Sequence, residues 1–284
     1  MAETSKISWT DATYNPWYGC RKVSPGCAYC YAERWASRAG KDFNAVMKAA
    51  PATFNAPEKW TKPRRIFTCS LSDFFIPEAD KWRDGAWRVI QNTPQHTYLI
   101  LTKRPERILD HLPRDWPWPN VHLGVSGENQ FMLNVRLGQL LRIKAAGYFL
   151  SLEPLLGPIL IGNLHDEWIR RKPFTVIVGG ESGGPEHRRL IGEVCACGDW
   201  NEDHVKGGEC RTCKSVGGTG GPGSQCKRFR FSHSEPKPDA LSWVRSIRDE
   251  CRAAGARFHF KQWGGARPES GGRELDGRIW DEHS

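Results

Sequence analysis

The feature of this sequence that most constrains its fold is the alternation of short apolar runs with helix-forming segments. Each apolar run ends in polar or charged residues, and the runs begin near Arg65, Thr97, Val121, Tyr148, Phe174 and Arg257. Continuous apolar strands that alternate with helices indicate a parallel sheet covered by helices. At 284 residues, the chain has the length of one barrel of this kind. We therefore predict an α/β fold, a partial (βα) barrel of the TIM type.

Helix signals are clearest at four places in the chain. Residues 31–39 have helix-forming composition and precede Gly40, a residue type that often follows a helix end. A second helix is expected over residues 80–91 and a third near 130–146. A fourth should begin at Pro238, because apolar residues then recur every three or four positions until Gly255.

Three cysteines near the start of the chain are candidate metal ligands. Cys20, Cys27 and Cys30 lie within eleven residues, in a stretch that also contains glycine and proline. Tetrahedral zinc would need a fourth ligand from elsewhere in the chain. A [4Fe-4S] cluster held by three cysteines instead leaves one iron open for a small chelating ligand. The three cysteines by themselves are compatible with either metal.

A second group of cysteines marks a segment that breaks the strand and helix pattern. Residues 192–234 are rich in glycine, and their close cysteine pairs are Cys195, Cys197, Cys210 and Cys213. Two close pairs favour structural zinc, while a second iron–sulfur cluster and unligated thiols are the alternatives. We interpret 1–191 and 235–284 as the barrel and 192–234 as an insertion, a candidate to select substrate or to dock a partner protein.

The charge of the chain favours a polyanionic partner. The formal net charge is +9, the pI is about 9.1, and the sequence contains 13 tryptophans, whose faces can stack on bases. We therefore predict nucleic acid as the partner. The alternative is that the basic residues are ordinary solvated surface charges and the tryptophans lie in the core. No apolar stretch is long enough for a membrane span and the start lacks a secretion leader, so we expect a cytoplasmic protein without membrane contact.

The chain resembles a phage-associated "three-Cys-motif" family of unknown function and, more broadly, the radical SAM superfamily. The residues that carry the resemblance are 9–17, Gly19-Cys20, Gly26-Cys27, 29–32, 153–156, 179–182 and 260–264. Residues 101–104 and 124–126 are distantly similar to spore photoproduct lyase, a DNA repair enzyme. The six residues between Cys20 and Cys27 exceed the three that are commonest in the superfamily.

The resemblance implies a [4Fe-4S] cluster on Cys20, Cys27 and Cys30 whose fourth iron binds S-adenosylmethionine (SAM). Electrons would come from a donor such as flavodoxin or ferredoxin, and a 5′-deoxyadenosyl radical would take hydrogen from the substrate. The residues that the resemblance and the strand ends suggest for SAM binding are Tyr29, Ser70, Asp73, Ser126, Glu128, Glu153, Gly179, Gly180 and Glu181. Helix capping is the alternative role for the serines and acids that follow strands.

Four further residues are candidates for substrate chemistry. Lys103, Arg104 and Lys261 follow or end apolar runs and are candidates to bind a substrate phosphate, unless they are merely exposed charges. Cys69, which we expect inside the apolar strand that begins near Arg65, is either an inert buried thiol or a hydrogen donor to a product radical. Three functions remain open: a radical SAM enzyme that repairs or modifies nucleic acid, one that acts on a small molecule or protein, and a non-enzymatic zinc-stapled nucleic-acid-binding protein.

Overall fold

The computed structural model describes residues 3–162, 173–195, 204–205, 209–210, 231–267 and 270–282. For residues 192–195, 204–205, 209–210 and 231–234 this description extends only to the backbone.

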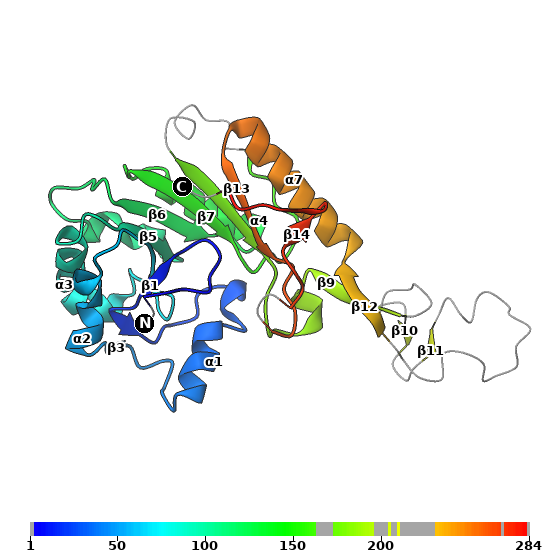
Figure 1. The fold of residues 1–284 in the computed structure, drawn as a ribbon, viewed down its shortest axis with the longest axis horizontal. Helices are drawn as coiled ribbons and strands as arrows, with labels where there is room; N and C mark the ends of the chain where they lie inside the picture. The colour runs from blue at the N-terminus through cyan, green and yellow to red at the C-terminus, as the bar shows by residue number, and fades with distance from the viewer. Residues whose placement is uncertain are drawn as a thin grey trace, which may run out of the picture.

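The centre of the molecule is a seven-stranded parallel sheet that curls into a half-barrel (Figure 1). Its strands, in spatial order, are β1 (Ala12–Tyr14), β4 (Arg65–Thr68), β5 (Thr97–Thr102), β6 (Val121–Ser126), β7 (Gly147–Leu152), β8 (Phe174–Gly179) and β13 (Arg257–Gln262). Every neighbouring pair in this order is parallel. The predicted α/β class and partial barrel architecture are therefore confirmed at this level.

The two faces of the sheet bury different sets of side chains, because successive residues of a strand point to opposite faces. On one face Ile100, Leu123 and Leu150 join the main core with residues of the helices. On the other face Phe67, Leu99, Phe149 and Ile177 pack around Trp9 in a smaller cluster. Both faces of the strands are thus covered, which explains why the strands read as continuous apolar runs.

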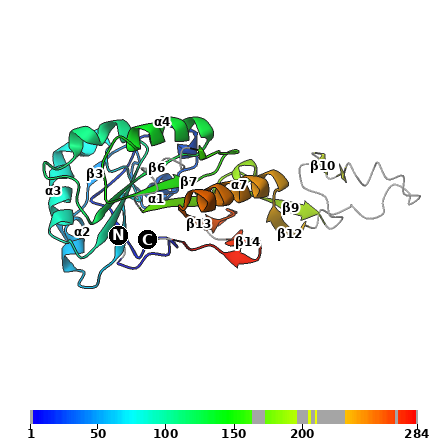
Figure 2. The same cartoon turned by 90° about the horizontal axis from the view of Figure 1, so that it is seen from above.

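Four of the described helices occur where the sequence predicts them: α1 (Tyr31–Arg38), α3 (Asp80–Gln91), α4 (Gln130–Leu140) and α7 (Pro238–Ala254). The short helix α2 (Pro51–Phe54) was not predicted. In Figure 2, α3 and α4 lie along one side of the sheet, while β14 lies along the other. The α4 helix ends earlier than position 146, because the Tyr148 hydroxyl donates to the Ile143 carbonyl and accepts from the Ala145 amide. These bonds hold residues 143–145 in a turn.

Short elements complete the described part of the chain. The two-stranded sheets pair β2 (Trp17–Tyr18) with β3 (Met47–Lys48), β9 (Ile191–Cys195) with β12 (Phe231–Pro236), β10 (His204–Val205) with β11 (Glu209–Cys210), and β14 (Glu274–Leu275) with β15 (Arg278–Ile279). The 3-10 turns are η1 (Pro25–Cys27), η2 (Ala56–Lys59), η3 (Pro77–Ala79), η4 (Pro105–Arg107), η5 (Leu109–His111) and η7 (Glu186–Arg188).

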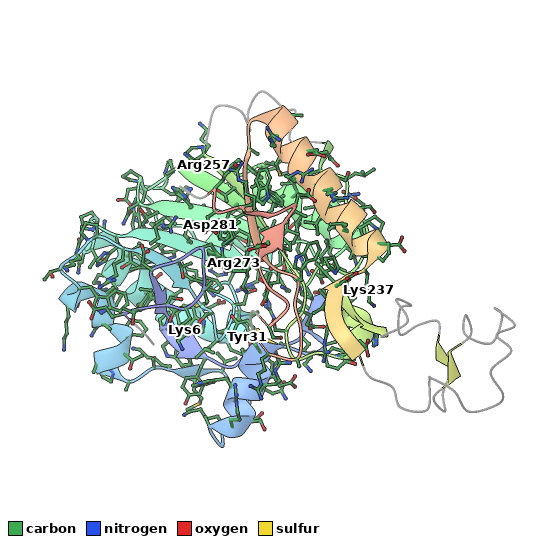
Figure 3. All side chains as sticks on the ribbon, turned by 45° about the vertical axis from the view of Figure 1, so that its right-hand side comes forward. Lys6, Tyr31, Lys237, Arg257, Arg273 and Asp281 are labelled. Carbon is green, nitrogen blue, oxygen red and sulfur yellow. The ribbon has the colours of Figure 1, made fainter. Side chains whose placement is uncertain are left out.

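Both end segments of the chain contact the edge strand β13. The Ser8 hydroxyl lies 2.9 Å from Nε2 of His259, and the Phe260 amide donates to the Trp280 carbonyl. Asp281, which also lies beside His259, forms an ion pair with Arg273 (Figure 3). The segment that contains Ser8 leads into β1 at the opposite edge, so it links the two edges of the half-barrel. Among the described helices, none has the length and apolar character needed to cross a membrane.

Candidate active site

The loop that contains the three cysteines follows β1 and β2. We call residues 20–30 the cysteine loop. It begins after Gly19, whose φ of 89° favours glycine and whose Cβ, if present, would lie 2.5 Å from the Ala45 carbonyl oxygen. The Cys20 amide donates to the Phe43 carbonyl, and Cys30 immediately precedes α1. The loop therefore has a fixed start and a fixed end.

The three thiols are partly exposed, and two of them share an apolar support. Cys20 and Cys30 pack against a cluster formed by Ala32, Ala36 and Phe43. Burial raises the pKa of Cys20 to about 12, and Asp73 adds to this shift while Arg104 opposes it. Within the described ranges, no three His, Cys, Asp or Glu side chains are already grouped around one metal position. Ligation of one centre would therefore require the loop to draw its thiols together.

Asp73 organises the ends of β4 and β5. Its carboxylate accepts hydrogen bonds from the Thr102 hydroxyl at 2.7 Å, from the Lys103 amide at 2.9 Å and from Nη1 of Arg104 at 3.0 Å. Asp73 and Arg104 are only 5% and 6% exposed. Arg104 also donates to the Arg21 carbonyl, 2.9 Å away, and its Nη1 lies 3.9 Å from Sγ of Cys20. Arg104 is thus a buried support of the cysteine loop.

Lys103 differs from its neighbour Arg104. Its side chain is half-buried, and no ion pair or hydrogen bond of its ammonium group occurs among the described residues. Of the two cations predicted to bind phosphate at this strand end, Lys103 is therefore the one without a direct ion-pair partner in the described structure, although its charge acts on Glu128.

Glu128, which follows β6, contacts the cysteine loop directly. Its Oε1 accepts a hydrogen bond from the Gly26 amide at 3.1 Å, and its Oε2 lies 2.8 Å from Nη1 of Arg136. Its side chain is fully buried. Burial alone would raise the pKa of Glu128, but Lys103, the Ser24 side chain and Arg136 together hold it below the ordinary value. Glu128 is therefore a buried carboxylate rather than a helix cap, a role that Asn129 takes by accepting from the Met132 amide.

Glu153 and Lys261 form an ion pair across a strand. Nζ of Lys261 lies 2.7 and 2.8 Å from the two carboxylate oxygens of Glu153, although β8 separates their strands. Gly179 of β8 lies between them, and a Cβ there would be in ordinary van der Waals contact with both, 3.4 Å from Glu153 and 3.5 Å from Lys261. Both charged side chains are about one-fifth exposed. The pair is therefore accessible at the carboxyl end of the sheet.

The Gly-Gly-Glu triplet after β8 also reaches the cysteine loop. Glu181 forms an ion pair with Arg188, and Nη2 of Arg188 donates to the Pro25 carbonyl at 3.0 Å. The same guanidinium lies 5.0 Å from the ring centre of Tyr29. A Cβ on Gly180 would lie only 2.2 Å from the Trp263 carbonyl oxygen, so no side chain fits there.

The remaining candidates occupy varied environments. Asn15 holds Ser70, donating to its hydroxyl at 2.9 Å, and the Ser70 carbonyl accepts from the Tyr31 hydroxyl. Ser126 is 2% exposed.

Cys69 does not lie within β4 as expected but follows it, with a φ of 65°. It is buried, and burial raises the pKa of its thiol well above the ordinary value.

The predicted second metal site falls mostly outside the described residues. Cys197 and Cys213 are not described, and Cys195 and Cys210 are described only through the backbone of β9 and β11. The antiparallel pair of β9 with β12 brings residues 191–195 alongside 231–236, so the segment predicted as an insertion leaves and rejoins the barrel at one place.

The comparison with family models gives one match over most of the chain. The model described as "Protein of unknown function (DUF5131)" matches residues 4–195 and 232–284. The chain belongs to this family. For this DUF5131 protein, a search of curated proteins and a search of solved structures each found no significant match.

Several contacts of the DUF5131 site could not be foreseen from the sequence. Gly26 belongs to a motif that carries the family resemblance, but nothing in that motif indicates its contact with Glu128, and Arg136 and Arg188 resemble ordinary surface arginines when read along the chain. Their partners are 102, 8 and 163 residues away. Sequence reasoning could have noted only Asn15, which stands directly after β1 as the other candidates stand after their strands.

Proposed function

We propose that this protein is a radical SAM enzyme that acts on nucleic acid. The observation that carries the proposal is the position of the cysteine loop, which is hydrogen-bonded to groups at the carboxyl ends of several parallel strands. In barrels of parallel strands, that end is where active sites form. Three thiols in one loop also suit a cluster with one open iron better than a closed zinc site.

The three cysteine thiols are chemically suitable ligands for a [4Fe-4S] cluster. Cys20, Cys27 and Cys30 would supply its three protein ligands. When bound together with SAM, such a cluster supplies reductive cleavage of the sulfonium and thereby hydrogen abstraction from a substrate. An electron donor of the flavodoxin or ferredoxin type would be required.

The protein residues would position the reactants and balance charge. Tyr29 offers an aromatic face between two of the ligands, and Ser70 and Glu153 place polar groups after the carboxyl ends of β4 and β7. Glu153 and Lys261 together offer one negative and one positive group, and each is partly accessible. These groups suit a ligand with both an ammonium and a carboxylate group, as SAM has.

Nucleic acid is the favoured substrate because of charge. The chain has a formal net charge of +9, and Lys103 places a cation without an ion-pair partner in the described structure at the site itself. A phosphate near Lys103 would release counterions on binding. Repair or modification of a base is therefore the proposed class of reaction.

The test is anaerobic reconstitution of the full chain. Iron, sulfide and zinc are counted per chain, then dithionite and SAM are added and 5′-deoxyadenosine is measured. We expect about four irons for a three-cysteine cube, with formation of the nucleoside, and loss of both in Cys30→Ala. The matched control is Cys251→Ala, which removes a buried thiol of α7 and leaves the cysteine loop unchanged.

Zinc without iron, with SAM left intact, would overturn the proposal and leave a metal-stapled binding protein. Iron and SAM cleavage without salt-sensitive binding of DNA or RNA would keep the radical SAM chemistry but reject nucleic acid as the substrate.

A further inference from the structure

The six residues between Cys20 and Cys27 are held in place by three similar ion pairs, each of which hydrogen-bonds to their backbone. Three carboxylate–arginine pairs stand at the carboxyl end of the sheet: Asp73 with Arg104, Glu128 with Arg136, and Glu181 with Arg188. Each pair uses one further hydrogen-bonding atom to hold the backbone of this segment. The atoms held are the carbonyl oxygens of Arg21 and Pro25 and the amide of Gly26.

We infer that these three pairs act together as a clamp that sets the position of the backbone between Cys20 and Cys27, so that both thiols can serve one metal centre. This inference rests on the proposed function for the metal, while the clamp itself can be tested without it. Asp73, Glu128 and Glu181 follow β4, β6 and β8, so the segment is held from three separated points of the half-barrel.

Burial makes these three carboxylate–arginine pairs different from surface ion pairs. The side chains of the three pairs are between 0% and 11% exposed. Exposed pairs contribute little and are easily broken, whereas breaking a buried pair leaves an unpaired charge in a low dielectric environment. The segment also has two exposed ion pairs of its own, Arg21 with Glu78 and Lys22 with Glu33. Removal of one of these exposed pairs is a control for removal of a buried pair that holds the same segment.

The packing around Gly26 supports the same conclusion. A Cβ on Gly26 would lie 2.9 Å from the carboxyl carbon of Glu128, so the backbone comes closer to the buried acid than any side chain would permit. Arg188 adds a second contact to the loop through the ring of Tyr29. A six-residue spacing, which would otherwise allow many conformations, is thereby limited to fewer of them.

The experiment uses metal-free full-length protein and measures hydrogen exchange at the Gly26 amide and the rate of tryptic cleavage after Lys22. Arg188→Met removes the donor to Pro25 and unpairs Glu181. Glu128→Gln keeps an acceptor for Gly26 but loses its charge. We expect both rates to rise about tenfold in Arg188→Met, the size expected for the loss of a charged hydrogen bond, and to rise less in Glu128→Gln.

Glu78→Gln, which removes only an exposed pair, should leave both rates unchanged. Circular dichroism checks that each variant is folded. Unchanged exchange and cleavage in both folded clamp variants, or an equal increase in Glu78→Gln, would overturn the inference.

Cobalt(II) separates the clamp from the proposed metal site. Thiolate-to-cobalt absorption reports how many thiolates bind the ion, and the loss of a supporting residue weakens metal binding by about tenfold or more. Weaker cobalt binding and fewer bound thiolates in Arg188→Met, but not in Glu78→Gln, would show that the clamp brings the ligands together. If wild-type protein assembles no iron–sulfur cluster on reconstitution while the exchange results hold, the clamp stands and the proposed metal function fails.

Discussion

The backbone amide of Gly26 donates a hydrogen bond to Oε1 of Glu128 across 3.1 Å, although 102 residues separate them in the chain. This contact joins the cysteine loop to the end of β6. Because Glu128 is fully buried and paired with Arg136 of α4, the loop is tied to a buried part of the connection between β6 and α4.

Gly26→Ala should destabilise the protein because its new methyl group would lie 2.9 Å from the Glu128 carboxyl carbon. Overpacking of this kind costs about 1–3 kcal/mol. The matched control is Gly138→Ala in α4, where a Cβ meets nothing within 4 Å and the change should stabilise by about 0.5–1 kcal/mol. Urea unfolding of the two variants measures both effects. Equal stability of Gly26→Ala and wild type would contradict the close approach.

Lys103→Ala should weaken binding of single-stranded DNA or RNA and reduce the salt dependence of the binding constant by about one unit of slope. The reason is that Lys103 has no ion-pair partner in the described structure and follows β5 at the proposed site. Lys144→Ala, an exposed lysine just before β7 at the opposite end of the sheet, should change binding little. Fluorescence anisotropy at several salt concentrations tests this. The same loss in both variants would mean that only overall charge matters.

His259 should make stability fall in mild acid. Burial lowers the pKa of His259 to about 4, although Asp281 opposes the shift, and the unfolded imidazole has a pKa of about 6.5. The unfolded state therefore binds more protons between these values, so stability is fully present above about pH 6.5 and is lost as the pH falls toward about 4, by about 3 kcal/mol for a shift of this size.

The variant His259→Gln tests this pH dependence. Urea unfolding at several pH values should show a shallower loss of stability than in wild type. Part of the slope should remain, because burial also lowers the pKa of His122 to about 4. The exposed His187 provides the control, His187→Gln, with an unchanged slope. A slope in His259→Gln as steep as in wild type would be inconsistent with a buried neutral imidazole.

The described thiols should differ in reactivity. In native metal-free protein, iodoacetamide should modify Cys27 and Cys30 first, because they are partly exposed. Cys20 should react more slowly, since burial raises its pKa to about 12 and the thiolate is the nucleophile. Cys69 and Cys251 should remain unmodified until the protein unfolds, because both are buried and burial raises their pKa values. Mass spectrometry of tryptic peptides reads out each site. Rapid modification of Cys69 would instead favour an accessible, chemically active thiol.

The sequence by itself determined the class of fold and the places where its strands and helices lie. Apolar runs such as 97–102 and the spacing of apolar residues in 238–254 are local patterns, and local patterns depend on side-chain periodicity that can be read directly. The same logic placed Asp73, Glu128 and Glu153 after strands, and therefore at one end of a parallel sheet.

Only the tertiary structure decided which of these groups meet. Arg104 and Lys103 are adjacent in the chain, but one is buried against Asp73 and the cysteine loop while the other keeps a charge without an ion-pair partner in the described structure. Glu153 reaches Lys261, which is 108 residues away in the chain, across the intervening strand β8. Such pairings arise from the curvature and register of the sheet, which bring together residues 31, 83 and 108 positions apart, and no local pattern in the sequence encodes them.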